Sequence, residues 1–284
     1  MSVKIVTDSA ADLPDQLVQE LGITVVPLYV RFGKEVYRER VEISEDEFYH
    51  RLEHDPIHPV TIQPGPQDFL EVYKELSPDA EGIVSIHISG KLSGTCNSAL
   101  MAKEMMETGC PIEVIDSQSI TMGLGFIAIV AATMAKAGEN LDKVVEEVKQ
   151  AIPNIRVLGL LDTLKYLLLG GRIGKAKALL GSILNVKPMI TLKDGEVVPA
   201  GQVRTRAKGI QRLFDFVKDA SNIQDLAILH STTPDEAQTL AEQVAPIFAK
   251  ERIKFARLGT TLGVHGGPGF LAVALREESQ SAED

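Results

Sequence analysis

The sequence predicts an α/β protein of two domains: an N-terminal three-layer α/β/α domain with a parallel sheet, and a C-terminal α/β domain with a mixed sheet. In the first half, short runs of β-branched apolar residues alternate with helical patterns, which is typical of a parallel sheet covered on both faces. In the second half, Asp194-Gly195 separates two strand patterns and predicts a hairpin, so that sheet contains antiparallel strands. The change falls near Pro153, and we therefore expect domains at residues 1–153 and 154–284.

The clearest strand of the first half covers residues 82–89, where Ile83, Val84 and Ile86 form a short, mostly β-branched run. Ser44 followed by Glu47 is a capping-box pattern and predicts the start of a helix. The other elements follow from the same two kinds of pattern. Strands are expected at 4–7, 23–29, 82–89 and 112–115, a hairpin turn at 32–34, helices at 14–21, 44–54, 69–76, 97–107 and 120–138, and irregular chain at 61–66.

The second half has the same two kinds of pattern, but Gly and Pro interrupt them more often. A helix at 141–151 precedes the break at Pro153, and the last residues, from 277, are acidic and rich in Ser, so we expect a frayed end. Strands are expected at 156–161, 186–192, 197–203, 226–230, 254–258 and 273–275, and helices at 164–169, 205–219 and 234–249.

Three strands of the first half end in small polar residues. Asp8-Ser9 follows the first strand, residues 89–93 follow the strand at 82–89, and Asp116-Ser117 follows the next. Carboxyl ends of parallel strands meet at one edge of a sheet, which is where open α/β sheets bind ligands. Ser93 is expected at the first turn of a helix, where unpaired N–H groups favour an anion. Each polar group taken singly is also a normal helix cap.

The composition disfavours several classes of partner. The net charge of −10 argues against a nucleic-acid backbone, and the 5% aromatic content argues against stacking platforms for single strands. The longest apolar run, 120–135, is shorter than the roughly 20 residues that span a bilayer. Cys96 and Cys110 lack the spacing of metal ligands and suggest reduced thiols. Because the first residues enter a strand at once, we expect no signal peptide and a cytoplasmic location.

Two glycine-rich stretches are candidates for binding. The first, 265–269, begins with His265, and loops of this kind often bind ligands, although a turn histidine is the alternative. The second places Arg172 directly after Gly170-Gly171, just past a helix end. That guanidinium either neutralises the helix end or lies near an acidic ligand. Residues 265–269 have the wrong length for a phosphate-binding P-loop, and the loop of Ser93 fails the same test because Lys91 precedes Ser93 and Gly94.

A metal site is the less favoured interpretation of the histidines. His50, His54 and His58 recur at intervals of four, which can mimic metal ligands on one helix face. Pro56 interrupts the helix before His58, and no Cys or ordered carboxylate set accompanies them. We therefore expect a solvated helix face and no metal.

A serine hydrolase is the enzymatic alternative. Ser93 and His265 are far apart in the chain, but a fold can pair such residues as nucleophile and base. The residues around Ser93 do not form the G-x-S-x-G elbow of α/β-hydrolases. A phosphotransferase that uses the glycine-rich loops also stays open.

Several short motifs are weak singly but specific in their order and spacing. They are Asp8-Ser9-Ala10-Ala11-Asp12-Leu13, Thr61-Ile62-Gln63-Pro64, Ser89-Gly90-Lys91-Leu92-Ser93-Gly94-Thr95, Asp116-Ser117, Leu164-Lys165-Tyr166, Gly170-Gly171-Arg172-Ile173-Gly174, Lys187-Pro188 and His265-Gly266-Gly267-Pro268-Gly269. With them the chain resembles, over about residues 3–278, the DegV family of bacterial fatty-acid-binding proteins. The resemblance implies two α/β domains with one long-chain fatty acid, such as palmitate, between them. Some members present that acid to a separate fatty acid kinase, which makes acyl-phosphate from ATP for phospholipid synthesis.

The resemblance also implies a set of site residues. The hydroxyls of Ser93 and Thr61 would hydrogen-bond the carboxylate, and Arg172 and His265 would lie at or near the same end. The implied role is lipid binding without catalysis, in kinase presentation or lipid transport, and no cofactor or metal is implied. Candidate tunnel walls, for most of which plain core is the favoured alternative, are Phe126, Ile127, Ile129, Leu160, Leu161, Leu164, Leu167, Leu168 and Leu169.

Overall fold

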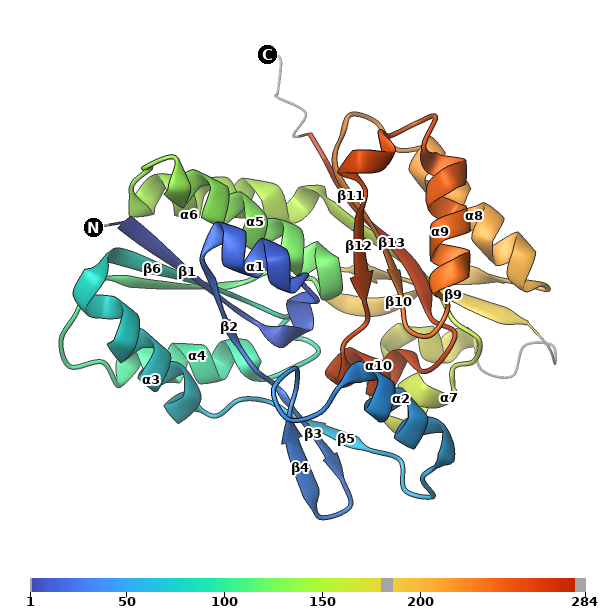
Figure 1. Ribbon diagram of the computed structural model, residues 1–284, viewed down its shortest axis with the longest axis horizontal. Helices are drawn as coiled ribbons and strands as arrows, with labels where there is room; N and C mark the ends of the chain where they lie inside the picture. Colours follow the sequence, from blue (N-terminus) through green and yellow to red (C-terminus); the bar gives the residue numbers. More distant parts are fainter. Residues whose placement is uncertain (1, 180–185, 279–284) are drawn as a thin grey trace.

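The computed structural model describes residues 2–179 and 186–278 and contains the parallel sheet predicted for the first half (Figure 1). Its strands are β1 (Ser2–Asp8), β2 (Ile23–Val26), β6 (Ala80–His87) and β7 (Ile112–Asp116). They lie in the order β2-β1-β6-β7, and every neighbouring pair is parallel. The polar residues after β1, β6 and β7 therefore share one edge of the sheet, as the sequence predicts.

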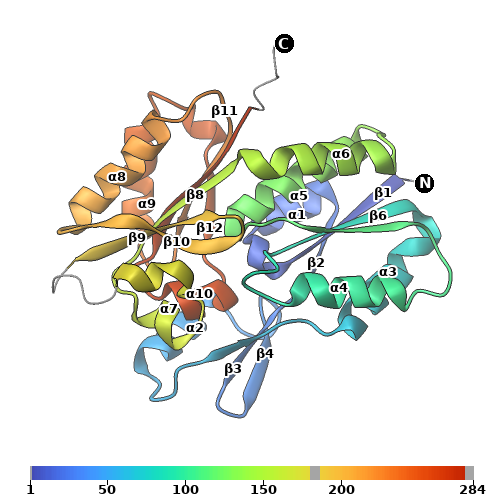
Figure 2. The ribbon, with the colours of Figure 1, turned by 180° about the vertical axis from the view of Figure 1, so that it is seen from behind.

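Helices cover both faces of this sheet, so the predicted three-layer arrangement is confirmed (Figures 1 and 2). One face carries α1 (Asp15–Leu21), α5 (Thr121–Lys136) and α6 (Leu141–Ala151). The other face carries α3 (Pro66–Leu76) and α4 (Thr95–Glu104). No helix in the described part of the chain combines the length and apolar character needed to cross a membrane.

The second half forms the predicted mixed sheet. Its strands are β8 (Ile155–Leu160), β9 (Lys187–Lys193), β10 (Glu196–Val203), β11 (Ile223–His230), β12 (Lys254–Arg257) and β13 (Leu271–Glu277). They lie in the order β10-β9-β8-β13-β11-β12, and only the β11–β12 pair is parallel. Asp194-Gly195 joins β9 to β10, which confirms the predicted hairpin. The outer face is covered by α8 (Arg206–Lys218) and α9 (Pro234–Val244).

Helix α5 lies between the two sheets. It contacts β1 and β6 of the parallel sheet and β8, β11 and β13 of the mixed sheet. One continuous apolar core therefore includes Ile5, Phe126 and Ala272, one from each layer. This helix gains its stability from burial on both sides, which explains the almost wholly apolar run in its sequence. The division at residue 153 stays a prediction, since this core serves both sheets.

The sequence did not predict a third, small sheet. The strand expected over 23–29 ends at Val26, because Pro27 has no N–H for the ladder. The chain then forms a separate sheet with the order β4-β3-β5. Its strands are β3 (Tyr29–Phe32), β4 (Glu35–Arg38) and β5 (Val60–Ile62). Residues 61–66 are thus not wholly irregular, and the turn expected at 32–34 is the β3–β4 hairpin.

Two further differences and two confirmations concern the helices. Helix α9 stops at Val244 instead of reaching 249, because Pro246 cannot continue the helix. A short helix, α10 (Thr260–Gly266), occupies a segment for which no helix was predicted, whereas α2 (Glu45–His54) and α7 (Lys165–Leu169) were expected. β13 ends at Glu277, the first residue of the end predicted to fray, and residues 279–284 of that end lie outside the described part. Short 3-10 helices cover Ser9–Ala11, Ser77–Asp79, Ile152–Asn154, Gly174–Leu179 and Lys250–Arg252.

Candidate functional site

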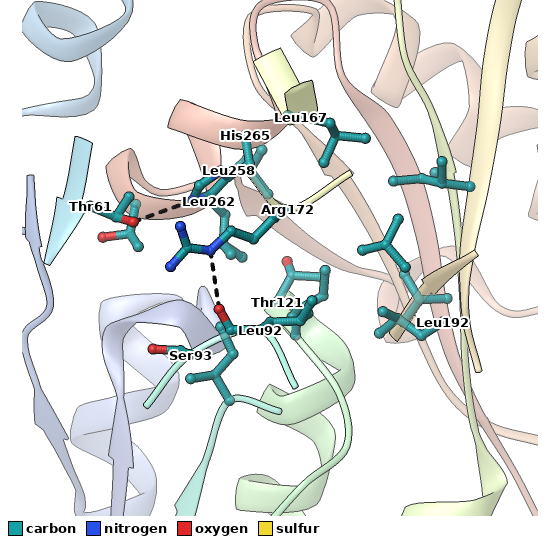
Figure 3. A pocket seen from close by; sticks show the side chains of 18 of the residues that line it. Thr61, Leu92, Ser93, Thr121, Leu167, Arg172, Leu192, Leu258, Leu262 and His265 are labelled. Carbon is teal, nitrogen blue, oxygen red and sulfur yellow. Dashed lines mark hydrogen bonds between the residues drawn. The ribbon is translucent and has the colours of Figure 1, made fainter. Parts of the chain in front are cut away.

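A cavity lies between the edge of the parallel sheet, the small sheet and the inner face of the mixed sheet (Figure 3). The space between its lining residues, counting the open mouth, is about 1000 Å³. Thr61, Ser93, Arg172 and His265 all line it. Side chains far apart in the sequence, singled out as candidates, therefore meet at one cavity.

Thr61 reaches the cavity because β5 is held from two sides. On one side it pairs with β3, with Thr61 opposite Val30. On the other, Gln63 lies against Gly94, and a side chain at Gly94 would collide with the Gln63 amide. The Gln63 amide also donates to Ser98 Oγ at 3.1 Å. The missing side chain at Gly94 thus lets the segment of Thr61 approach the loop of Ser93.

The sequence predicted Ser93 in the first turn of a helix. In the structure, Ser93 lies just before helix α4. The helix begins at Thr95 with Gly94 as N-cap. Ser93 Oγ lies 2.8 Å from Thr95 Oγ1 and accepts the Thr95 amide at 3.3 Å. The start of the helix therefore orients the hydroxyl, which at the same time borders the cavity.

His265 is a neutral imidazole on the last turn of α10. Its Nε2 lies 3.4 Å from Thr61 Oγ1. Burial lowers the pKa of His265 to about 3, and the charges of Arg172 and His58 act in the same direction. Nδ1 is buried, and no partner for it lies in the described part of the chain. At neutral pH this ring offers hydrogen bonds to a ligand but no positive charge.

Arg172 supplies the positive charge at this end of the cavity. Its Nε donates to Leu92 O at 3.2 Å, and its Nη1 donates to Gly170 O at 2.9 Å. The side chain therefore caps the carbonyl end of α7 and also extends between Thr61 and Ser93 (Figure 3). Two of its five donors are used in this way, which leaves others for an anion.

The apolar walls differ from those that the sequence suggested. Alternation along the strands directs Val157 and Gly159 of β8, Ile190 and Leu192 of β9, and Val197 of β10 into the cavity. Of the predicted wall residues, only Leu167 lines it. The others are core or surface. Phe126, Ile127, Ile129, Leu161 and Leu164 pack in the core around α5, Leu160 faces the opposite side of the mixed sheet, and Leu168 and Leu169 are exposed.

His50, His54 and His58, which recur at intervals of four, do not converge on one point. The rings of His50 and His54 stack with centroids 4.4 Å apart, whereas His58 lies 6.0 Å from the ring of Tyr166. Among residues 2–179 and 186–278, no three His, Cys, Asp or Glu side chains are grouped as metal ligands would be.

Comparison with known proteins places the chain. A family model described as "Uncharacterised protein, DegV family" matches residues 2–278. The chain belongs to the DegV family. A DegV domain-containing protein of Streptomyces coelicolor is 38% identical to it over 278 residues, which cover 96% of this chain and 98% of the relative.

Solved DegV structures share the fold. One from Thermus thermophilus, described by its fatty acid binding, has 34% identity and a TM-score of 0.90, with 98% of this chain and 100% of that chain covered. DegV from Bacillus subtilis, described as a fatty acid binding protein, has 29% identity and a TM-score of 0.88 with the same coverage.

Behind the cavity of this DegV chain lies a buried carboxyl group that sequence reasoning missed. Asp12 accepts hydrogen bonds from Thr121 Oγ1 at 2.6 Å and from Gly259 N at 2.9 Å. Burial raises the pKa of Asp12 to about 8, and the nearby Glu39 also raises it, while the hydrogen bond from Thr121 lowers it. Asp12 is thus largely protonated at neutral pH, and it joins α5 to the segment before α10.

A second buried carboxyl group, Glu39, holds the start of α10. Its Oε1 accepts Thr261 N at 2.8 Å and Thr260 Oγ1 at 3.1 Å, and its Oε2 accepts the hydroxyl of Ser9. Thr261 and Thr121 both line the cavity. The two carboxyl groups therefore fix cavity residues from both halves of the chain. Only the buried position of Glu39 would have distinguished it from the many surface Glu residues in the sequence.

A buried Asp-His-Ser chain has the order of a hydrolase triad but no access to a substrate. His87 Nδ1 lies 3.0 Å from Asp8 Oδ2, and His87 Nε2 lies 2.7 Å from Ser85 Oγ. All three side chains are fully buried, and Tyr73 donates to Ser85 Oγ at 2.8 Å. Asp8 also accepts the amide of Ile88, a cavity residue, at 2.9 Å. The network thus positions the sheet edge.

Asp12→Asn should alter how stability depends on pH. Folded Asp12 holds a proton up to about pH 8 but unfolded Asp12 only up to its ordinary pKa of 3.8, so folding takes up a proton between these values. Stability contributed by this group is therefore lost as pH rises, by up to about 1.4 kcal/mol per pH unit. In calorimetry, the wild-type-minus-variant difference in Tm should fall from about pH 5 to pH 8 and be flat above. Exposed Asp142→Asn is the control, and a constant difference for Asp12→Asn would contradict this assignment.

Gly170→Ala should displace His265. The new methyl would collide with His265 Nδ1, while the carbonyl oxygen of Tyr166 lies 3.2 Å away on another side. We expect a loss of about 1–3 kcal/mol in the free energy of unfolding, as for other overpacked sites. Urea denaturation measures it. Gly65→Ala, whose methyl would have no neighbour closer than 3.7 Å, is the control, and equal stability of the two variants would refute the expected clash.

Proposed function

We propose that this protein binds a long-chain fatty acid in the cavity, with the carboxylate between Thr61 and Ser93 and the tail along the mixed sheet. The observation that carries the proposal is the one-sided polarity of the cavity. Two hydroxyls, an imidazole and a guanidinium lie at one end, and the walls that the mixed sheet supplies are mostly apolar. The fatty acid binding described for the Thermus thermophilus relative supports the same ligand class.

The tail supplies most of the affinity in this proposal. Each methylene removed from water contributes about 0.8 kcal/mol, so a tail of about 14 methylenes offers on the order of 10 kcal/mol before ordering costs. A carboxylate buried without partners would cost several kcal/mol, whereas hydrogen bonds to a charged group return about 1.5–3 kcal/mol each. Thr61 and Ser93 therefore decide which end of the ligand is held here.

The neutral state of His265 suits this role. When its Nε2 carries the proton, it donates to Thr61 Oγ1, and the hydroxyl hydrogen of Thr61 is then free to donate to the ligand carboxylate. Ser93 donates from the other side, and the unused donors of Arg172 balance the negative charge. The carboxylate thus meets donors on several sides without a buried permanent cation.

The proposed protein carries its ligand and performs no chemistry of its own. Gln63 and Arg172, both exposed to solvent, border the polar end, so the carboxylate would be the part of the ligand nearest the surface. This orientation fits presentation of the acid group to a fatty acid kinase, or transport in the cytoplasm. A hydrolase is less well supported, since Ser93 pairs with Thr95 and His265 with Thr61.

Protein purified from cells under native conditions should carry a fatty acid. Native mass spectrometry should detect an added mass of one long-chain acid, because a cavity this apolar gains more from a tail than from water. Stripped protein should take up palmitate again. A ligand-free spectrum together with no uptake of palmitate would refute the proposed function.

The double variant Thr61→Ala/Ser93→Ala should retain fatty acid poorly. Loss of two hydrogen bonds to a charged group weakens binding by about 3–6 kcal/mol if nothing replaces them. Dissociation of palmitate, followed with a fluorescent competitor, should become at least about a hundredfold faster while the melting temperature changes little. Thr133→Ala/Ser221→Ala removes the same groups from exposed positions and should behave as wild type. Unchanged retention in the cavity variant would contradict the assigned carboxylate site.

A further inference from the structure

The cavity ends, on the side away from Thr61, at two side chains of the mixed sheet. Val157 of β8 and Leu192 of β9 both line it, and Leu192 lies far from Thr61 in Figure 3. Val157 is almost fully buried and Leu192 is half-buried. If the carboxylate is at Thr61 and Ser93, the methyl end of the ligand points toward this pair.

A second, more open groove begins on the far side of the same two residues. Val157 and Leu192 belong to the lining of both spaces, so they form the partition between them. Other lining residues come from the segment before α5, from the α6–β8 connection and from the β9–β10 turn. They are Gln118, Ser119, Lys149, Ile152, Pro153, Ile155, Asp194 and Gly195.

The geometry of the sheet makes this groove a continuation of the cavity. Residues two apart on a strand face the same side, so Val157 is followed by Ile155 on β8, and Leu192 by Asp194 at the end of β9. On the opposite wall, Ile120 lines the cavity while its neighbours 118–119 line the groove. One sheet face and one facing segment thus run through both spaces, interrupted by two side chains.

The chemistry changes at the partition. On the cavity side the walls are mostly apolar, whereas Gln118, Lys149 and Asp194 border the groove. The hydroxyl of Ser119 is buried there without a partner in the described part of the chain. Beyond the partition, the methylenes of a longer tail would contact polar groups and water in place of apolar walls. Each methylene that stays in water lowers the affinity roughly fourfold relative to a buried one.

We propose that Val157 and Leu192 form the end wall that sets the longest acyl chain the cavity accepts. This inference rests on the proposed fatty-acid binding and adds its length selectivity. Chains that end before the wall are buried completely. Longer chains must buckle inside the cavity or displace the wall, so they bind more weakly.

The test is a competition between palmitate and behenate, which is six carbons longer, for stripped protein, read by native mass spectrometry. Wild type should favour palmitate. In Val157→Ala/Leu192→Ala the wall loses five carbon atoms and the cavity opens into the groove, so the bound behenate-to-palmitate ratio should rise about tenfold or more. Leu192→Ala alone, at a half-buried position that tolerates truncation, should give a smaller rise in the same direction.

Val197→Ala is the matched control. Like Val157→Ala, it removes two methyl groups from the cavity lining. Val197 lies on β10, directly opposite Leu192 of β9, but it does not border the groove. Its ratio should stay near that of wild type. An unchanged ratio in both wall variants, or an equal rise in Val197→Ala, would overturn the end wall. In either case palmitate uptake by wild type would leave the proposed function intact, whereas failure of wild type to bind either acid would remove both.

Discussion

The structure depends on an unequal distribution of polar groups around one cavity. An aliphatic space between two sheets would ordinarily be filled by side chains, because protein interiors are close-packed. Here Gly159 keeps β8 clear, since a Cβ at that position would lie 2.9 Å from the ring of Phe270, and both residues line the space. The guanidinium of Arg172 and the imidazole of His265 lie at the opposite end, with the hydroxyls of Thr61 and Ser93. A ligand with one charged end and one long apolar end would match both the polar end and the apolar walls of this cavity.

Such a cavity stays open only if buried groups outside it hold its walls in place. The walls come from both halves of the chain, and a seven-residue helix such as α10 has little stability of its own. Glu39 accepts the amide and hydroxyl at its start, and Asp12 accepts the amide of Gly259 just before it. Two adjacent buried carboxyl groups cannot both be ionised cheaply, so protonation of Asp12 is the physical condition for this arrangement.

The sequence predicted most of the layered fold because its signals are local. Strand runs such as Ile83-Val84, the Asp194-Gly195 turn and the Ser44 cap specify their own conformations. It did not predict β5 or α10, whose conformations depend on distant partners, namely β3 for Thr61 and Glu39 for Thr261. Ser93, Arg172 and His265 were candidates from a helix start and two glycine-rich stretches, and the motifs of a family added Thr61. The true walls were missed because Val157 and Ile190 look like any other strand residues until the sheet is placed against β5.

The arrangement also bears on how a carrier of this kind releases its ligand. If His265 were charged, the carboxylate would lie between two cations, His265 and Arg172, in a partly dry site. Release of the ligand would then leave those charges unpaired, which costs free energy. Instead, burial keeps the imidazole neutral, and in the proposed complex the charge of the ligand would face the exposed guanidinium of Arg172, where water competes. Orientation then comes from geometry and affinity from the tail. Because the polar end borders solvent, the proposed orientation would let a partner with better donors bind the acid group while the tail is still buried.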